Sequence, residues 1–483
     1  MANKSKFQAI KGTRDLLPPE TELWNRVEQT AREVFATYGF GEIRPPIFEP
    51  TELFARAVGG ETDIVSKEMY TFFDPFNLEE VLTDSFIRVS EEIGSDEAKH
   101  LIDSDRNRFL AKITAMGFKK GDQISLRPEA TASVCRAYIE HGMHALPQPV
   151  KLYYTGPMFR RERPQKGRYR QFYQIGAEVL EALLPGQQDS AKSTGKDAAV
   201  DAEVIEMVMA FFAKLELAGV QLEINSIGCR ECRPKYVEAL RSELLKVKDR
   251  LGPDSQRRID TNPLRVLDSK LESEHEIIAM LPRIGDYLCE TCAKQYAEVK
   301  RQLAVREVRY KENWRLVRGL DYYMRTTFEI TARGLGSQNA VCGGGRYDGL
   351  VEILGGMPTK GIGFAIGEDR LILSMQEAGK GGAPTGRDVY IAWMGEKAQD
   401  TGIRAARALR QAGFRVELPP VEQKFGKALG QADKIGAKYA LILGDDEIAS
   451  GQWTLKTLAD GTQQKLTEPQ LQGFLRKTKE SSS

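Results

Sequence analysis

Residues 156–178 read GPMFRRERPQKGRYRQFYQIGAE, and the fold of the surrounding chain follows from this stretch. A hydrophobic run leads into a segment crowded with Arg and Lys, and the chain then returns through alternating polar and aromatic residues. We therefore expect two antiparallel strands joined by a long basic loop. Arg160 and Glu162 alternate with their neighbours along the first strand, which predicts that both side chains share one face of the sheet.

This pairing of a guanidinium with a carboxylate suits the recognition of a phosphorylated ligand. Arg160 can bind phosphate in a forked geometry, while Glu162 can orient an amine or a metal. The alternative is a solvated hairpin whose basic tip binds nothing. However, so many like charges in one loop repel one another unless an anion is present. The loop is therefore expected to bind an anionic partner.

The bulk composition describes an ordinary globular protein of several domains. A chain of 483 residues is too long for one hydrophobic core, so about two to four domains are expected. Apolar residues make up 41% and charged residues 28%, and the 69 basic and 68 acidic side chains give a net charge of only +1. General attraction to polyanions is therefore excluded, and nucleic acid would have to bind through local patches.

The sequence shows no feature of export or membrane insertion. The N-terminal residues MANKSKFQAIKGTRD contain no apolar core of a signal peptide, and no run of about 18 apolar residues occurs. We expect a cytoplasmic protein without membrane contact. Its six cysteines are then expected to be reduced thiols or metal ligands.

Only four histidines are present, His100, His141, His144 and His275, and none lies in a segment that resembles a motif. General base chemistry or metal binding by imidazole is therefore not expected. All four are interpreted as surface or helix residues.

Two Cys-x-x-Cys pairs occur, Cys229 with Cys232 and Cys289 with Cys292. Each pair can supply two ligands to one metal ion, and four thiolates suit tetrahedral zinc. The segment between the pairs is much longer than in common zinc ribbons, so two alternatives stay open. In the first alternative, the thiols are free or reversibly oxidised. In the second, they form a redox site.

Several segments with different patterns follow one another in the first half of the chain. Apolar spacing predicts a helix at 19–38, which leads into an extended stretch with a Pro-Pro pair. A charged stretch at about 75–122 is interpreted as an inserted helical or mixed hairpin. The segment PGQQDSAKSTGKDAAVD, which begins at Pro185, is expected to be a mobile surface loop before a helix from Asp201.

The second half contains a helical stretch and a separate C-terminal unit. Residues 229–301 show helical spacing, which indicates a domain inserted between strand-forming segments. A linker rich in Gly, Pro and Lys at 377–388 precedes 389–470, where alternating strands and helices predict a compact α/β unit with a mostly parallel sheet. Residues 471–483 are expected to form a disordered tail.

Together these segments resemble the class II aminoacyl-tRNA synthetases. The basic hairpin at 156–178 is similar to motif 2 of that class. The N-terminal helix with its Pro-containing strand is similar to motif 1, the dimer interface, and GIGFAIGEDRLIL (361–373) is similar to motif 3. The strings RERPQKGRYRQF (161–172) and RLVRGLDYY (315–323) most resemble the histidyl-tRNA synthetase family. The resemblance covers nearly the whole chain except the two expansions and the Cys pairs.

The resemblance implies an α+β catalytic core with a mostly antiparallel sheet, a helical inserted domain and a C-terminal α/β domain of the anticodon-binding type. The implied domains are 1–228 and 302–376 for the core, 229–301 for the insertion, 377–388 for the linker, 389–470 for the anticodon-binding domain and 471–483 for the tail. The implied activity is that of a histidine–tRNA ligase. It activates L-histidine with ATP and Mg²⁺ to histidyl-adenylate, releases pyrophosphate, and transfers histidine to the 3′ end of tRNA(His). A homodimer is also implied.

Site residues are carried over by their positions in this sequence. The implied catalytic residues are Arg160 and Arg318. ATP is expected to contact Arg160, Glu162, Phe172 and Arg370. Histidine is expected to contact Glu129, Thr131, Arg160, Gln174, Glu178, Arg318, Tyr322, Tyr323 and Tyr347. The tRNA acceptor end is expected to contact Arg163 and Gln165.

The residue types in this set suit the implied reaction. Arginines remain charged and bind phosphate as a fork, which helps two anions to approach each other. A carboxylate at Glu178 and a phenol at Tyr323 satisfy the two nitrogens of an imidazole ring, and Glu129 can accept from the α-ammonium group. Such a combination favours histidine over other amino acids.

Two other functions stay open at this point. A regulatory subunit of ATP phosphoribosyltransferase shares this catalytic fold without aminoacylating tRNA, but it lacks the C-terminal domain and the insertion that are present here. A class II synthetase for threonine, proline or glycine is the second alternative. The pairing of Glu178 with Tyr322 and Tyr323 argues against it.

Overall fold

The computed structural model describes residues 7–60, 62–73, 86–87, 89–104, 123–183, 191–333, 339–380 and 386–480. The chain divides into two compact units. The first comprises Met1–Leu16 and Trp24–Gly381, and the second comprises Leu17–Leu23 and Gly382–Ser483. The division after Gly381 falls inside the stretch expected to be a linker, and each unit has its own sheet.

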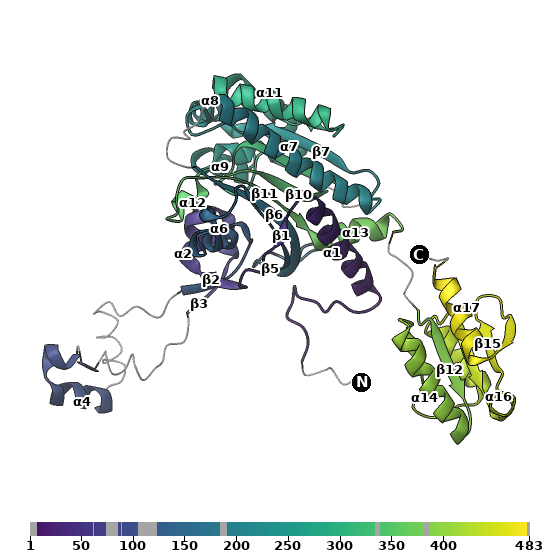
Figure 1. Ribbon diagram of the computed structural model, residues 1–483. Helices are drawn as coiled ribbons and strands as arrows, with labels where there is room; N and C mark the ends of the chain where they lie inside the picture. Colours follow the sequence, from purple (N-terminus) through teal and green to yellow (C-terminus); the bar gives the residue numbers. More distant parts are fainter. Residues whose placement is uncertain are drawn as a thin grey trace. The chain divides into compact units, whose positions relative to one another are not determined.

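An eight-stranded sheet forms the centre of the first unit (Figure 1). Its order is β1-β5-β6-β11-β10-β9-β7-β8, and neighbouring strands are antiparallel except at the edges, where β1–β5 and β7–β8 are parallel. The strands are Gly41–Glu42 (β1), Val150–Phe159 (β5), Gln171–Ala182 (β6), Gln221–Ser226 (β7), Lys311–Glu312 (β8), Met324–Thr331 (β9), Ala340–Arg346 (β10) and Thr359–Gly367 (β11). The prediction of a mostly antiparallel core is confirmed.

A smaller antiparallel sheet has the order β2-β4-β3, with strands Phe48–Pro50 (β2), Tyr70–Phe73 (β3) and Gln123–Leu126 (β4). The helices of the first unit, apart from short 3₁₀ and π turns, are Glu20–Thr37 (α1), Thr51–Val58 (α2), Ser95–Ser104 (α4), Thr131–Glu140 (α6), Ala191–Lys214 (α7), Cys232–Lys246 (α8), Pro253–Thr261 (α9), Glu272–Ala279 (α10), Glu290–Val305 (α11), Leu350–Ile353 (α12) and Glu368–Glu377 (α13).

Strands β5 and β6 form the antiparallel hairpin that the basic stretch predicts. The ladder continues past the strands, because the Arg160 N–H donates to the Arg170 carbonyl at 2.9 Å. Strand β5 ends at Phe159, so Arg160 and Glu162 lie just beyond the strand rather than within it. Their charged groups nevertheless lie on the same side of the chain, 3.9 Å apart.

Aromatic side chains hold α1 and α7 against the sheet. The ring of Phe35 on α1 is fully buried and lies 5.9 Å from Phe211 on α7, 5.8 Å from Phe364 on β11 and 5.7 Å from Tyr153 on β5. Tilted and edge-to-face rings at these distances add attraction to the apolar burial. These contacts cover one side of the sheet and leave the other available for a site.

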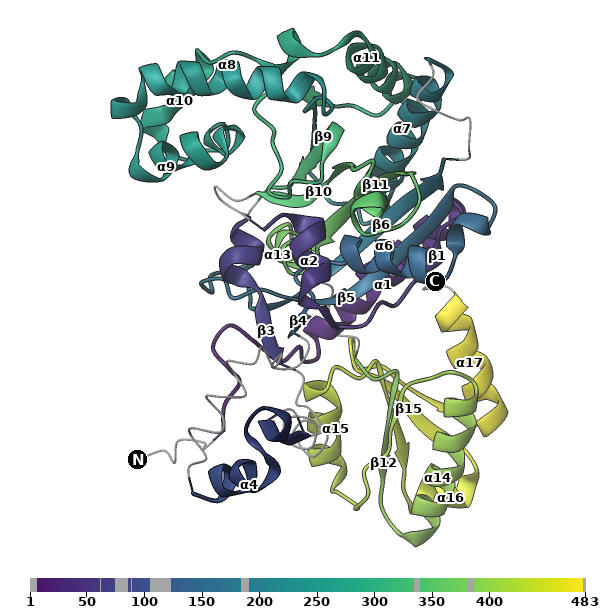
Figure 2. The same cartoon turned by 90° about the vertical axis from the view of Figure 1, so that its left-hand side faces the viewer.

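Helices α8–α11 follow β7 and precede β8 in the sequence, and they form the helical insertion (Figure 2). Their apolar faces meet at Leu240, Ile259 and Ile278, all of which are fully buried. Helix α11 lies beside α7 in both views, which anchors the end of the insertion to the core (Figures 1 and 2).

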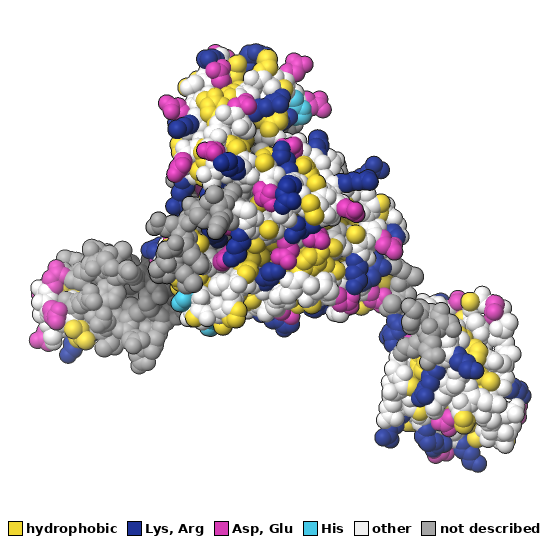
Figure 3. All heavy atoms as spheres, turned by 45° about the horizontal axis from the view of Figure 1, so that its top comes forward, with side chains coloured by type: hydrophobic (Ala, Val, Ile, Leu, Met, Phe, Trp, Pro, Cys, Tyr) yellow, Lys and Arg dark blue, Asp and Glu magenta, His cyan; other side chains and the backbone are white. Residues whose placement is uncertain are grey.

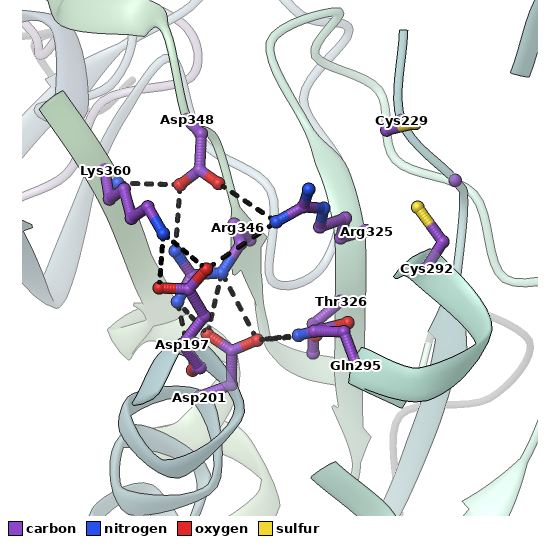
Figure 4. A network of polar contacts seen from close by, with 12 residues as sticks. Asp197, Asp201, Cys229, Cys292, Gln295, Arg325, Thr326, Arg346, Asp348 and Lys360 are labelled. Carbon is purple, nitrogen blue, oxygen red and sulfur yellow. Dashed lines mark hydrogen bonds and ion pairs between the residues drawn. The ribbon is translucent and has the colours of Figure 1, made fainter. Parts of the chain in front are cut away.

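Charged side chains buried between α7 and strands β9–β11 form one connected network (Figure 4). Arg346 donates to Asp201 at 2.6 Å and to Asp348 at 2.8 Å, while Lys360 donates to Asp197 at 2.7 Å. Arg346 and Asp201 have side-chain exposures of only 3% and 0%. Since a buried charge is tolerated only when it is paired, this network fixes α7 in one register on the sheet.

The second unit contains a five-stranded sheet in the order β13-β12-β14-β15-β16. Its strands are Val389–Trp393 (β12), Val416–Glu417 (β13), Tyr439–Leu443 (β14), Trp453–Thr457 (β15) and Gln463–Leu466 (β16), and its helices are Glu396–Gln411 (α14), Phe425–Lys434 (α15), Asp445–Ser450 (α16) and Glu468–Glu480 (α17). The predicted α/β class is confirmed. The prediction of a mostly parallel sheet is wrong, because β14–β15 and β15–β16 are antiparallel.

Two other predictions from the sequence are corrected. The tail expected to be disordered is helical as far as Glu480, because Leu471 and Leu475 lie one turn apart and are both 1% exposed. The loop expected from Pro185 is already helix α7 from Ala191, held by buried ion pairs that local composition does not reveal. Most of the expected insert at 75–122 lies outside the described residues. In the part that is described, 86–87, 89–93 and 95–104 are helical.

Acidic and basic side chains are interspersed on the face of the molecule that Figure 3 shows. Among the described residues, no helix has the length and apolar character needed to span a bilayer.

Arg346→Met should destabilise the first unit strongly, because it leaves Asp201 buried without its counter-charge. We expect the free energy of unfolding to fall by about 3–5 kcal/mol, measured by urea denaturation. The matched control is Lys246→Ala, which removes a pair with Glu243 whose side chains are 66% and 45% exposed. That change should stay below about 1 kcal/mol. Equal effects of the two substitutions would contradict a role of the network in stability.

Candidate active site

A cleft of about 770 Å³ opens on the first unit. Strands β5, β6, β9 and β10, helix α13 and the segment before β9 contribute to its wall. The expected site residues that line it are Glu129, Thr131, Arg160, Glu162, Phe172, Gln174, Arg318, Tyr322, Tyr323 and Arg370. Residues that are far apart in the sequence therefore meet in one polar cavity.

Four expected site residues do not line this cleft. Glu178 and Tyr347 lie directly behind its wall, where both are buried. Arg163 and Gln165 belong to the basic loop, but Gly167, Arg168 and Tyr169 are the loop residues that reach the cleft.

Positive charge dominates one end of the cleft. The Arg160 Nε donates to the Pro128 carbonyl at 3.0 Å, and its guanidinium lies 5.2 Å above the ring of Phe172. Glu162 is the nearby carboxylate, and it accepts from Arg168 at 3.0 Å. Burial, together with the positive charge of Arg168, lowers the pKa of Arg370. Three arginines facing one carboxylate leave an excess of positive charge, which suits a polyphosphate.

Arg318 projects into the middle of the cleft. Its Nη1 donates to Glu329 at 3.0 Å, and its guanidinium lies 5.6 Å from the ring of Tyr323. The buried Nε has no hydrogen-bond partner among the described residues. Gly343 on β10 makes room for this side chain, because a Cβ at that position would overlap the guanidinium. A donor in this place can serve a ligand oxygen.

Polar groups suited to an ammonium ion line the part of the cleft around Glu129. Glu129 accepts from the N–H groups of Thr131 at 2.8 Å and Ala132 at 3.0 Å, so it caps helix α6. A carboxylate retains further lone pairs after two such bonds. The buried Oε1 of Gln174 has no hydrogen-bond partner within the described part of the chain. Both groups are therefore available to accept from a charged amine.

Glu178 is the central residue of a buried polar cluster behind Thr131, which lines the cleft. It accepts from the Thr131 hydroxyl at 2.7 Å and from the Tyr347 hydroxyl at 2.5 Å. Burial raises the pKa of Glu178 to about 8 despite these two hydrogen bonds. Gly363 on the neighbouring strand leaves the space that the carboxyl group occupies. Tyr322, which lines the cleft, packs edge-on against Tyr347, with ring centroids 5.7 Å apart.

Several residues that the sequence did not single out contribute to the same site. Asp369 lines the cleft and accepts from the Tyr173 N–H at 3.0 Å and from Arg14 at 3.1 Å. Its neighbour Arg370 was identified within motif 3, so the same string contained the signal. The insertion also lines the cleft, through Asp254, Ser255, Arg258, Arg265, Asp268, Ser269, Lys270 and Leu271. No motif indicated these residues.

The two Cys-x-x-Cys pairs come together away from the cleft wall. The sulfur of Cys229 lies 3.6 Å from that of Cys232 and 3.8 Å from that of Cys289, and the sulfurs of Cys232 and Cys292 are 3.8 Å apart. All four sulfurs lie within 4.8 Å of one another, and none forms a disulfide. Tetrahedral zinc with bonds of about 2.3 Å places its thiolates about 3.8 Å apart. The spacing therefore fits one zinc ion.

Backbone donors favour the anionic form of one of these sulfurs, that of Cys229, whereas burial raises the pKa of Cys289 and of Cys292 in the absence of a metal. The Glu231 N–H points to the sulfur of Cys229 at 3.4 Å, and the Cys229 N–H points to that of Cys232 at 3.1 Å. Although burial opposes ionisation, N–H donors from Cys232 and Glu231 lower the pKa of Cys229 to about 7. Thiolates held in this way are good ligands for a soft, divalent ion.

A mostly antiparallel sheet that brings the motif arginines to one cleft defines the catalytic domain of a class II aminoacyl-tRNA synthetase. The model of the histidyl-tRNA synthetase family matches residues 102–371, and that of an anticodon-binding domain matches 388–478. A histidine–tRNA ligase of Solibacter usitatus is 48% identical over 467 residues, which cover 96% of this chain and 98% of the relative. The chain belongs to the histidyl-tRNA synthetase family.

Solved structures agree with this assignment. The apo histidyl-tRNA synthetase of S. aureus is 32% identical and covers 97% of this chain and 99% of its own, with a TM-score of 0.70. A protein of Bacillus halodurans C, described as an ATP phosphoribosyltransferase regulatory subunit/histidyl-tRNA synthetase, is 17% identical with a TM-score of 0.58, and this likeness concerns the fold alone. The alternatives considered from the sequence are not supported by these matches.

Gly343→Ala should displace the Arg318 guanidinium, because the added methyl group occupies its place. We expect the rate of pyrophosphate exchange to fall about 100-fold or more, the scale for loss of one oriented donor. The control is Gly195→Ala on α7, where a methyl group would contact nothing within 4 Å. Exchange by Gly343→Ala at a rate close to that of the parent would show that the position of Arg318 is not critical.

Proposed function

We propose that this protein is a histidine–tRNA ligase in which the cleft of the first unit carries both steps of the reaction. The carboxylate of L-histidine attacks the α-phosphorus of ATP to form histidyl-adenylate, and pyrophosphate leaves. The 3′-terminal ribose hydroxyl of tRNA(His) then attacks the activated carbonyl, and AMP leaves. The single observation that carries this proposal is the meeting of the motif arginines with Glu129 and Gln174 in one cleft.

We assign ATP to the positive end of the cleft. Arg160 and Arg370 are placed to bind its phosphates, Phe172 to stack on adenine, and Glu162 to accept from the adenine amino group. ATP enters as its Mg²⁺ complex, and the metal neutralises part of the phosphate charge. Arginines that are already ordered lose little rotational freedom when the nucleotide binds.

Arg318 is assigned to the reacting centre between the two substrates. Its guanidinium can meet both the histidine carboxylate and the α-phosphate, whose like charges would otherwise oppose their approach. The buried Nε without a protein partner supports this role, since a ligand oxygen would satisfy it.

Histidine is assigned to the part of the cleft around Glu129. Glu129, Thr131 and Gln174 receive the α-ammonium group, and Tyr322 and Tyr323 flank the imidazole ring. Glu178 and Tyr347 form the polar layer behind these tyrosines. We assign to Glu178 the choice of a ring that offers an N–H donor, because its carboxylate keeps lone pairs beyond those used by Thr131 and Tyr347.

The tRNA is assigned to both units. Arg163 and Gln165 of the basic loop meet the acceptor end through phosphates and bases, and the second unit reads the anticodon. We also propose a homodimer and a cytoplasmic location. The homodimer is inferred from the resemblance of the N-terminal segment to motif 1. The thiols of Cys229, Cys232, Cys289 and Cys292 are assigned to one structural zinc ion, in accord with their spacing.

Pyrophosphate exchange with each of the twenty amino acids tests the proposed activity. Only L-histidine should support exchange, and only tRNA(His) should then be charged. The basis is the buried polar cluster at Glu178, which leaves an unpaired polar group when the ligand lacks a ring N–H. Exchange with threonine, proline or glycine in place of histidine would contradict the proposal.

Glu178→Gln should weaken histidine binding and change how the stability of the unliganded protein depends on pH. Glutamine has one acceptor oxygen where two hydroxyls now donate, so the polar layer must rearrange. We expect the KM for histidine to rise about 30-fold or more, at a cost of about 2–4 kcal/mol. The KM for ATP should be unchanged in the same exchange assay.

The stability difference should depend on pH. The pKa of Glu178 is raised to about 8 in the folded state by burial, so folding favours its protonated form. The stability that the protonated Glu178 contributes is fully present below the pKa that Glu178 has in the unfolded chain, and it is lost as the pH rises to about 8. Relative to Glu178→Gln, the parent should therefore lose thermal stability between about pH 5 and 8. A constant difference in Tm over this range would contradict the raised pKa of Glu178, and a matching rise in the KM for ATP would contradict its selective role.

A further inference from the structure

We propose that the metal held by the four cysteines positions Tyr322 and Tyr323, and thereby sets the affinity of the cleft for histidine. This inference rests on the zinc ion and the histidine pocket of the proposed function. It adds a specific mechanical link between them, which three sets of contacts carry.

The first link is the strand pairing that ends at the metal site. The β7–β9 ladder continues beyond β7, because the Ile227 N–H donates to the Arg325 carbonyl and the Arg325 N–H donates to the Gly228 carbonyl, both at 2.8 Å. Cys229 is the next residue after this pair. The side chain of Met324 packs directly against the cysteine cluster. The residue that follows Tyr323 is therefore in contact with the metal ligands.

The second link is Arg233, which follows Cys232 on helix α8. Its Nε donates to the Ile227 carbonyl at 3.1 Å, and its Nη2 donates to the carbonyl of Tyr323. The N–H of Arg233 donates to the Cys229 carbonyl at 3.0 Å. One residue thus joins the two segments: its backbone binds the first Cys-x-x-Cys pair, and its side chain binds the backbone of the residue expected beside the imidazole ring.

The third link runs through α11, which begins directly after Cys289. Gln295 lies one turn beyond Cys292 and donates to Thr326 on β9 at 2.9 Å and to Asp201 at 2.7 Å. Figure 4 shows Gln295 and Thr326 at the edge of the buried charge network, with Cys292 nearby. The start of α11 is therefore tied to the same strand from the other side.

The metal completes this arrangement because its ligands come from two distant segments. Cys229 and Cys232 precede Cys289 and Cys292 by 60 residues each, and thiol-to-thiol contacts alone are weak. One ion bonded to all four sulfurs holds α8 and α11 together around the start of β9. Between these supports, Arg325 adopts a left-handed backbone with φ of 51°, a strained conformation for a residue other than glycine.

The consequence should be selective for one substrate. Tyr322 and Tyr323 lie on the segment that the metal supports, whereas Arg160, Phe172 and Arg370 belong to the β5–β6 hairpin and α13. None of the contacts in the three links involves that hairpin or helix. Loss of the metal should therefore weaken histidine binding more than ATP binding.

Cys292→Ser tests the link because it removes one buried ligand. Protein purified without added metal should hold about one zinc per chain in the parent and clearly less in the variant. In pyrophosphate exchange, the variant's KM for histidine should rise at least about fivefold, the lower end of typical coupling between sites. Its KM for ATP should stay within about twofold of that of the parent.

Two further variants separate the link from general loosening of the insertion. Met324→Ala keeps all four ligands but removes the contact with the cluster, so zinc should remain while the KM for histidine rises. Ile278→Ala creates a cavity in the insertion on α10, where the side chain is fully buried. It should lower the stability of the insertion and leave both the zinc content and the KM for histidine unchanged.

The parent protein provides a test that needs no substitution. Coupling between two sites is reciprocal, so L-histidine should raise the affinity for zinc, measured as equilibrium competition with a coloured chelator, whereas ATP alone should not. Loss of zinc without any change in the KM for histidine would overturn the link and leave the ligase assignment intact. Absence of zinc from the parent would overturn the metal site itself, and absence of histidine-dependent exchange would overturn the proposed function.

Discussion

Charge buried on the central strands is the constraint on which the rest of the structure depends. Arg346, Lys360 and Arg325 lie within the core of the first unit, where water cannot solvate them. Asp197 and Asp201 reach them from α7, and this requirement for partners sets the register of the helix on the sheet. The same sheet carries the cleft, so a fixed α7 also means fixed positions for β9 and β10.

The cleft differs from this core, where buried charges are paired, because buried polar atoms of the cleft lack a partner within the described part of the chain. The Arg318 Nε and the Gln174 Oε1 lack hydrogen-bond partners among the described residues. Such groups destabilise the unliganded protein, and substrates that satisfy them gain affinity in return. Glycines make the arrangement possible, because Gly343 and Gly363 leave the volume that Arg318 and Glu178 occupy. Polar groups thus approach the strands closely without loss of sheet pairing.

Much of the fold and part of the site could be predicted from the sequence. The basic hairpin, the helical insertion and the C-terminal α/β unit follow from local patterns of charge and hydrophobicity, and the mostly antiparallel core follows from the family resemblance. Predictions were wrong where distant contacts override local composition. Ala191 begins a helix because residues further along α7 are held by buried ion pairs, and the final helix forms because Leu471 and Leu475 are buried.

The sequence by itself determined which chemical groups are present: the motif arginines, the carboxylates and tyrosines suited to histidine, and two pairs of thiols. Only the tertiary structure decided how these groups meet. It brought the sulfur of Cys229 within 3.8 Å of that of Cys289 across the three intervening helices α8–α10, and it placed Glu178 behind the cleft wall rather than in it. It also tied Tyr323 to the backbone of the first Cys-x-x-Cys pair through Arg233. The physical reason is that spacing along a chain fixes neighbours only within a turn or a strand pair, whereas the packing of buried charge and apolar surface fixes all others.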